Sequence, residues 1–366
     1  ARMTLPSGMN SPLTIRYPEL AQAPAPDLIG EGLRATYEMV AGSPEVVSGR
    51  GDVAYTKGDY GAGLVQIDVV ALEEGQAATW TVSYAPDATT GAMKKVNFYG
   101  AVNPAGCGDF WCNPAVLAAI LDRAGDDLNV DRGKYDLDGR EYDVIRFYSR
   151  SQGITLGMIY DLDTGILLHH TADFSSSLPT EEGGMITRGQ NAIMKLKNLR
   201  QVAIPWNGGR LPSWAGAGST LYFQGQHSFW LPQLPDVAPT VSPLSVQIDI
   251  QAAHDRFVEG RQQTHTQEAV PPPYVPLVSG LSQLMGIWVP EEALSLPEGT
   301  VDSDPDTGMV VSILSSGPDG LVMQQTNNVN YKLTAAYDAR GRVVQTVTES
   351  YTGTATGQKD ELQLVE

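Results

Sequence analysis

The feature that most constrains the fold of this chain is an internal repeat that spans most of its length. A Val-Gln-Ile-Asp-Val segment at residues 65–69 recurs as Val-Gln-Ile-Asp-Ile at residues 246–250. The further matches pair Trp111, Pro114 and Leu117 with Trp288, Pro290 and Leu294, residues 160–168 with 337–344, and residues 32–37 with 218–222. All four matches occur in the same order, and from residue 65 onward their offsets stay between 181 and 176. Collinear self-similarity of this kind indicates two copies of one structural unit.

The repeat sets the domain organisation that we expect. A chain of 366 residues is too long for one ordinary hydrophobic core and suits two domains. We divide it into a Pro-rich N-terminal arm at 1–29, a first copy at 30–205, a turn-rich linker at 206–215 and a second copy at 216–366. An arm of this composition is normally floppy, so it is ordered only if its own domains or a neighbouring subunit hold it.

Strand signals dominate both copies, because short runs rich in β-branched and aromatic residues are bounded by Gly, Asp or Asn. The predicted strands are 64–70, 79–84, 142–148, 156–160 and 166–172 in the first copy, and 246–250, 309–314, 331–337 and 343–351 in the second. One short helix is predicted per copy, at 115–123 after the capping Asn113 and at 290–294. We therefore expect a mostly β protein of two tandem homologous antiparallel β domains. A curved sheet or open barrel and a two-sheet sandwich both fit this pattern.

The composition limits the classes of binding partner and the cellular location that we expect. The net charge of −18 is spread along the chain, which disfavours nucleic acid and anionic membrane surfaces as partners. No stretch approaches the roughly 20 apolar residues of a transmembrane helix, so no transmembrane segment is expected. The chain begins at Ala1 without the pattern of a signal peptide. We expect an exported protein, extracellular or on the cell surface, whose leader has been removed.

The two cysteines, Cys107 and Cys112, lie in one Gly-containing loop with four residues between them. In an exported protein this spacing favours a local disulfide. A zinc pair is disfavoured because no second Cys or His pair lies nearby, and a redox motif is disfavoured because the Cys-x-x-Cys spacing is absent.

Two acidic loops are candidate calcium sites. Asp302, Asp304 and Asp306 place carboxylates at alternate positions before Gly308, as hard Ca²⁺ ions prefer. The corresponding part of the first copy carries Asp127, Asn129 and Asp131. The alternative interpretation for both loops is a solvated turn, which the same residue types favour.

No catalytic pattern is present, since Gly-x-Ser-x-Gly, His-Glu-x-x-His and the phosphate-loop motif are all missing. We expect a non-catalytic structural or assembly subunit of an extracellular filament, surface layer or larger complex. It would associate with itself or with other surface proteins. In one form of this hypothesis, residues 1–29 make that contact. The alternative is an extracellular or periplasmic binding module for an apolar ligand or glycan. Its predicted fold resembles lipocalins and periplasmic lipoprotein carriers, and a large apolar cavity would favour this alternative. A hydrolase with a dispersed site is the third hypothesis.

Overall fold

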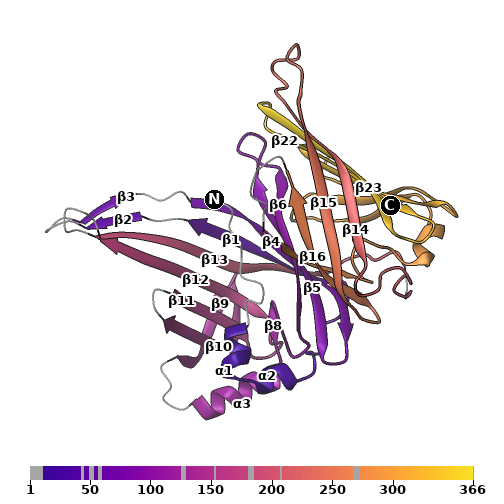
Figure 1. Cartoon of the computed structure of the whole chain (residues 1–366). Coiled ribbons are helices and arrows are strands. Elements are labelled where there is room, and N and C mark those ends of the chain that lie inside the picture. Colours follow the sequence, from indigo (N-terminus) through magenta and orange to yellow (C-terminus); the bar gives the residue numbers. More distant parts are fainter. Residues whose placement is uncertain are drawn as a thin grey trace.

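The computed structural model describes residues 11–365, apart from 43–44, 49–52, 57–59, 125–128, 152–153, 180–184, 207 and 267–272. The chain is mostly β, with 61% of residues in strands and 8% in helices, arranged as two large antiparallel sheets (Figure 1). We call the part that carries the first sheet, residues 11–201, the first half, and the part that carries the second sheet, residues 220–365, the second half. The predicted fold class is confirmed, and neither sheet closes on itself within the described residues.

The first sheet runs in the order β6-β5-β4-β1-β13-β12-β11-β10-β9. Its strands are β1 (Leu33–Gly42), β4 (Tyr60–Glu73), β5 (Gln76–Pro86), β6 (Met93–Pro104), β9 (Val130–Leu137), β10 (Arg140–Ser151), β11 (Ile154–Asp161), β12 (Leu167–Pro179) and β13 (Met185–Gln201). Two short strands, β2 (Glu45–Ser48) and β3 (Val53–Thr56), extend this sheet beside β13. A separate small hairpin is formed by β7 (Cys107–Gly108) and β8 (Trp111–Cys112).

The second sheet runs in the order β17-β16-β15-β14-β23-β22-β21-β20-β19-β18. Its strands are β14 (Thr220–Trp230), β15 (Thr240–Ala253), β16 (Phe257–His265), β17 (Val275–Gly280), β18 (Gly299–Ser303), β19 (Val310–Gly317), β20 (Gly320–Thr326), β21 (Tyr331–Asp338), β22 (Val343–Thr352) and β23 (Thr356–Val365). From β17 to β19 this order repeats that of the first sheet from β6 to β9, and β18 is an addition at the edge.

Local details of the two copies also correspond. Trp111 forms a bridge with Ile166 in the first half, and Trp288 forms the equivalent bridge with Arg342 in the second. In both copies a glycine follows the turn before this bridge, Gly165 with φ 77° in one and Gly341 with φ 67° in the other. A side chain at either glycine would collide with a backbone carbonyl of the neighbouring segment. Turn chemistry and tertiary contact therefore demand glycine at the same place in both copies.

Helices cover the inner face of the first sheet. They are α1 (Ser11–Arg16), α2 (Glu19–Gln22) and α3 (Pro114–Ala124), which lie together below the sheet in Figure 1. The α3 helix starts as predicted, because the Asn113 side chain accepts hydrogen bonds from the backbone N–H groups of Ala115 and Val116 at 3.0 and 3.3 Å. Leu117 of α3 and Ile67 of β4 belong to one fully buried core. The first half thus has its inner face filled by its own helices.

Residues 11–29 of the N-terminal arm belong to that core, so of the two expected ways of ordering the arm, its own domain holds this part of it. Leu13 and Leu20 are 4% and 0% exposed and pack with residues of the first sheet. The Tyr17 ring lies 5.7 Å from the Phe147 ring. Burial of these side chains therefore holds residues 11–29 against the first half. No helix in the described part of the chain is long and apolar enough to cross a membrane.

The second half is built differently on its inner face. In place of α3 it has one short 3₁₀ helix, η1 (Glu291–Ser295), which corresponds to the predicted 290–294 helix. Strand β17 packs against β6, β5 and β4 of the first half. Gly280 of β17 lies so close to the Val70 carbonyl that a side chain there would collide with it. The first half therefore covers part of the second sheet.

Candidate functional site

Strand β4 is buried on both faces, and this places the first half against the second. Val65 and Ile67 face the core beneath the helices of the first half. Leu64, Gln66 and Asp68 alternate with them and face the second half, where Leu64 joins a cluster with residues of both halves. Register extends this second face across the sheet, since Asp68 lies opposite Trp80 and Trp80 opposite Gly100. One face of β4, β5 and β6 therefore forms a wall toward the second sheet.

A cavity of about 400 Å³ lies between this wall and the inner face of the second sheet. We call it the apolar cavity. Burial alternates along β15, where Leu244, Val246 and Ile248 point inward and line it. Leu277 of β17 and Ala335 of β21 line it as well. The lining is thus built mainly from aliphatic side chains, as is usual for small-molecule sites.

The wall contributed by the first half carries two stacked aromatic rings and a lysine. Trp80 and Phe98 have ring centroids 5.1 Å apart with an interplanar angle of 29°. The Lys95 Nζ atom lies 4.9 Å from the centroid of the Phe98 ring and 5.9 Å from that of Trp80. Burial lowers the pKa of the Lys95 ammonium to about 8, while the negative charge of Asp68 opposes this shift.

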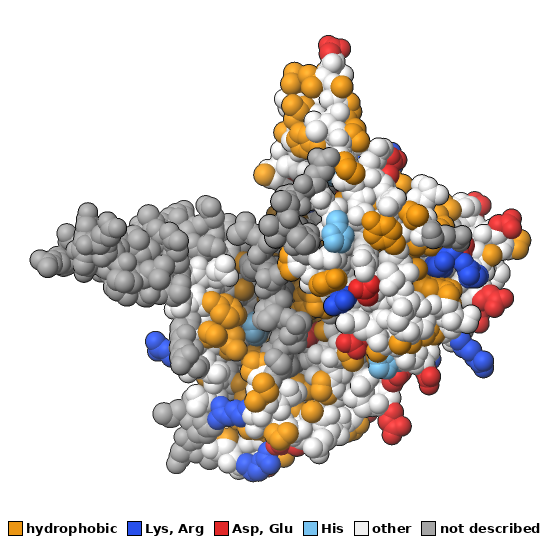
Figure 2. Space-filling view, in the orientation of Figure 1, with side chains coloured by type: hydrophobic (Ala, Val, Ile, Leu, Met, Phe, Trp, Pro, Cys, Tyr) orange, Lys and Arg blue, Asp and Glu red, His pale blue; other side chains and the backbone are white. Residues whose placement is uncertain are grey.

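Polar side chains mark one end of the apolar cavity. Thr346 and Thr348 of β22 and Asp360 of β23 line it there. The Asp360 Oδ1 atom lies 2.6 Å from Nδ1 of His227 on β14. The hairpin that joins β14 to β15 projects from the second half, and Figure 2 shows hydrophobic side chains along it, with Leu234 50% exposed. This hairpin leads directly into the strand that carries the aliphatic lining.

The turn between β5 and β6 is fastened to the second half by hydrogen bonds at its tip. The Asp87 Oδ2 atom accepts a hydrogen bond from Gly353 N at 2.8 Å. Asn327 Nδ2 donates to the Met93 carbonyl at 2.8 Å, and Lys94 Nζ donates to Thr352 Oγ1 at 2.9 Å. Backbone N–H groups of Thr90, Gly353 and Thr89 that donate to Asp87 lower its pKa to about 2. These bonds hold the cavity wall in place at its far end.

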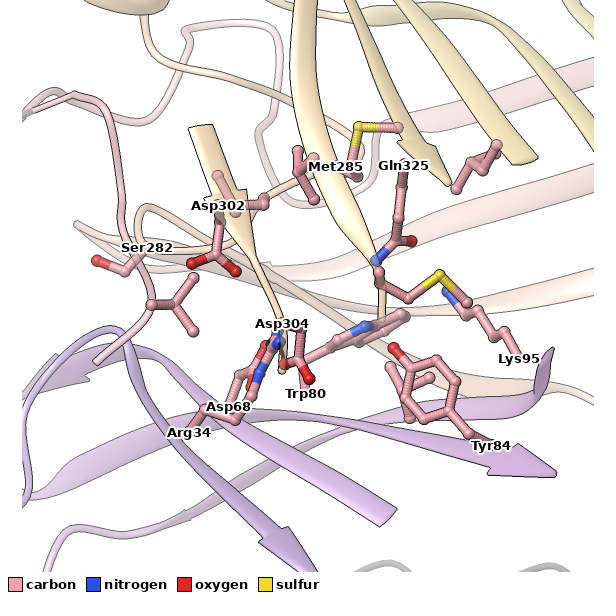
Figure 3. Close-up of a pocket in the computed structure, with 16 residues that line it drawn as sticks. Arg34, Asp68, Trp80, Tyr84, Lys95, Ser282, Met285, Asp302, Asp304 and Gln325 are labelled. Atoms are coloured by element: carbon pink, nitrogen blue, oxygen red, sulfur yellow. Dashed lines mark hydrogen bonds and ion pairs between the residues drawn. The ribbon is translucent and has the colours of Figure 1, made fainter. Parts of the chain in front are cut away.

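A network of five charged residues joins the halves at the near end; its members are Arg34, Asp68, Arg200, Asp302 and Asp304. Figure 3 shows four of them, all except Arg200. Arg34 forms a two-pronged pair with Asp68 at 2.6 and 2.7 Å and also donates to Asp304 Oδ2 at 2.7 Å. Arg200 forms a two-pronged pair with Asp302 at 2.9 and 2.8 Å and donates to the same Asp304 oxygen at 2.7 Å. Asp304 thus bridges two arginines of the first half.

The two arginines control the ionisation of Asp304. Its side chain is only 2% exposed, and this burial by itself would raise its pKa. The charge of Arg34, the hydrogen bond from Arg200 and a backbone hydrogen bond from Thr307 outweigh burial, so the pKa of Asp304 lies well below its usual range. The carboxylate therefore stays ionised in the folded protein at any moderate pH.

The structure gives the predicted calcium loop of the second copy a different set of partners. Asp302 and Asp304 face guanidinium groups, and Asp306 Oδ2 accepts from Asn198 Nδ2 at 3.2 Å. Among the described residues, no group of three His, Cys, Asp or Glu side chains is placed to hold a metal ion. The acidic loop thus contributes to the contact between the halves, and calcium binding there stays a prediction.

The acidic loop of the first copy is only partly described. Asp127 lies outside the described residues. The Asn129 carbonyl accepts a hydrogen bond from Tyr148 N at 2.8 Å, and Asp131 pairs with Arg146 at 3.3 Å. Calcium binding by Asp127, Asn129 and Asp131 therefore stays a prediction.

The predicted cysteine pair lies on the small hairpin β7–β8, with the two residues directly opposite each other. Their Sγ atoms are 2.9 Å apart, and both side chains are buried. Burial, together with the neighbouring Cys107 thiol, raises the pKa of the Cys112 thiol well above its usual range. The two sulfurs are adjacent but farther apart than the 2.05 Å or so of a disulfide bond, so the disulfide stays a prediction.

Comparison with protein-family models gave no match, and comparison with the sequences of characterised proteins gave none either. Comparison with solved structures returned the translocator domain of autotransporter NalP from Neisseria meningitidis at 9% identity, covering 96% of this chain and 93% of that chain. The TM-score of that superposition is 0.13, which is too low to carry any argument.

Proposed function

We propose that this protein is a non-catalytic binding module that holds an apolar or amphipathic small molecule in the apolar cavity of its second half. The observation that carries this proposal is the cavity itself, with about 400 Å³ of space between the second sheet and the wall of β5 and β6. Small-molecule sites typically measure about 300–1,000 Å³ and are lined mostly by hydrophobic and aromatic side chains.

The contrast between the two copies supports this proposal. In the first half, residues Val65 and Ile67 of β4 pack under α1, α2 and α3. Their counterparts in the repeat, Val246 and Ile248 of β15, line the cavity. Protein interiors are normally close-packed, so a space of this size beside aliphatic side chains suits a ligand that replaces the missing helices. The position of the cavity follows from the duplication.

The assembly role expected from the sequence stays a prediction, and an ordered Pro-rich arm was one of its several motives. Leu13 and Leu20 of the arm are buried in the core of their own chain, so this part of the arm is held without a neighbouring subunit. We retain an exported location as part of the proposal, since carriers of apolar molecules are useful where such molecules must cross water.

The proposal is tested by measuring what the purified protein contains and what it binds. Native mass spectrometry should detect a bound small molecule, and an environment-sensitive apolar fluorophore should bind the ligand-free protein. We expect Ala335→Trp to weaken binding of the fluorophore at least about tenfold, because Ala335 is 3% exposed and faces the cavity. Ala336→Trp is the matched control, since adjacent strand residues point to opposite faces. Equal binding by both variants, or no binding by the wild-type protein, contradicts the proposal.

A further inference from the structure

Lys95 is the charged group on the wall of the apolar cavity. It lines both this cavity and a small polar pocket of about 50 Å³ that contains Arg34, Asp68 and Asp304. Its side chain is half-buried and extends beside the rings of Trp80 and Phe98. Within the described part of the chain, no carboxylate lies within ion-pair distance of its Nζ atom. The lysine therefore stands at the boundary between apolar and polar surroundings without an anion of its own.

The acidic groups near Lys95 already have partners among basic side chains. Asp68 is paired with Arg34, and Asp304 with both Arg34 and Arg200. Asp302 is paired with Arg200, and Asp360 across the cavity with His227. The hydroxyl groups of Tyr84 and Tyr331 also face this region from β5 and β21, and burial raises the pKa of both, so they remain neutral. Lys95 is the one Lys or Arg side chain among the described residues that line the cavity, while Arg34 and Arg200 face three aspartates outside it.

A single buried ammonium has an energetic consequence. Removing a charge from water costs free energy unless an opposite charge or hydrogen bonds replace the lost hydration. The faces of Trp80 and Phe98 offset part of this cost through cation–π attraction. An anion delivered by a ligand would offset more of it, because a charge-assisted hydrogen bond in low dielectric is stronger than one in water.

We propose that the ligand of the cavity is a fatty acid and that Lys95 binds its head group. Its carboxylate would accept a hydrogen bond from Lys95 Nζ, and its alkyl chain would lie against the aliphatic lining formed by Val246, Ile248 and Leu277. Lys95 is the only lysine or arginine among the described residues that line the cavity, and one ammonium pairs with one carboxylate better than it balances a doubly charged phosphate ester. This inference rests on the proposed function and specifies its ligand class.

The test compares laurate with dodecanol, which share the alkyl chain and differ in charge, by calorimetry on delipidated full-length protein. The variants are Lys95→Met, which keeps length and removes charge, and Lys95→Arg, which keeps charge. Lys197→Met is the control, because Lys197 lies on β13 of the first half, pairs with Glu38 and does not line the cavity. Melting temperatures of all variants establish that each one folds.

The wild-type protein is expected to bind laurate at least about tenfold more tightly than dodecanol at neutral pH. Lys95→Met should lose that preference while its affinity for dodecanol stays unchanged, and Lys95→Arg should keep much of it. The wild-type preference for laurate should also decline as the pH rises past the pKa of Lys95 in the ligand-free protein. Lys95→Met should show no such decline. Equal laurate binding by wild type and Lys95→Met overturns the role of Lys95 but leaves the cavity as a ligand site. Failure of the wild-type protein to bind either compound overturns the proposed function itself.

Discussion

Replacing Asp304 with asparagine removes the central carboxylate of the charge network while keeping the size of the side chain. Asp304 Oδ2 accepts hydrogen bonds from Arg34, Arg200 and Gln66 at 2.7, 2.7 and 2.9 Å. An asparagine amide can accept through one oxygen only and brings N–H donors toward two guanidinium groups. At the contact between the halves, the variant therefore removes one of the two carboxylates that each arginine contacts.

The size of the loss in stability depends on the ion pairs that the two arginines keep. Breaking a buried ion pair by removing one partner typically costs about 3–5 kcal/mol. Arg34 keeps its two-pronged pair with Asp68, and Arg200 keeps its pair with Asp302. Because neither arginine is stranded completely, we expect the low end of this range, about 3 kcal/mol less free energy of unfolding.

Urea unfolding followed by tryptophan fluorescence measures this loss. The matched control is Asp306→Asn in the same loop, since Asp306 is half-buried and accepts one hydrogen bond, from Asn198 at 3.2 Å. That control should lower the free energy of unfolding by no more than about 1 kcal/mol. If Asp304→Asn is no more destabilising than Asp306→Asn, the network does not stabilise the contact between the halves.

Two further predictions concern acid and the cysteines. Because the pKa of Asp304 is lowered on folding, its stabilisation is complete above the pKa of an unfolded aspartate, about 3.9, and is lost as the pH falls further. The difference in unfolding free energy between wild type and Asp304→Asn should therefore shrink below about pH 4, and a constant difference would contradict this assignment. Cys107 and Cys112 should resist iodoacetamide in the folded protein, because both thiols are buried. If they form the predicted disulfide, they should resist it after unfolding without reductant as well, and alkylation there would show free thiols.

Features set by local sequence could be predicted from the chain alone. The strands and the hairpin turns with Gly165 and Gly341 depend on periodicity and turn chemistry within a few residues. The repeat is visible by comparing the sequence with itself. The cap of α3 by Asn113 has the same local character. The arm was not predicted as helical, because its five prolines hide two short helices that packing against the first core stabilises.

The site depended on contacts that local sequence does not contain. Asp304 has partners from residues 34 and 200, which are distant along the chain, so a cluster of aspartates suggested calcium where arginines lie. Trp111 and Trp288, which the repeat pairs with each other, are core residues at 0% and 1% exposure. The cavity uses Trp80 and Phe98 instead. The one signal near them in the sequence was the predicted strand at 79–84, which contains Trp80.

Access to the apolar cavity depends on how firmly its two ends are held. The near end is fixed by the charge network, in which Asp304 is 2% exposed and each arginine makes a two-pronged pair. The far end is fixed by single hydrogen bonds from Lys94, Asn327 and Gly353, and that of Lys94 is exposed to solvent. Exposed hydrogen bonds exchange with water at little net cost, whereas buried ion pairs do not. We therefore expect the wall of β5 and β6 to open at its tip, the turn that joins these two strands. The charge network should hold the other end of the wall in place.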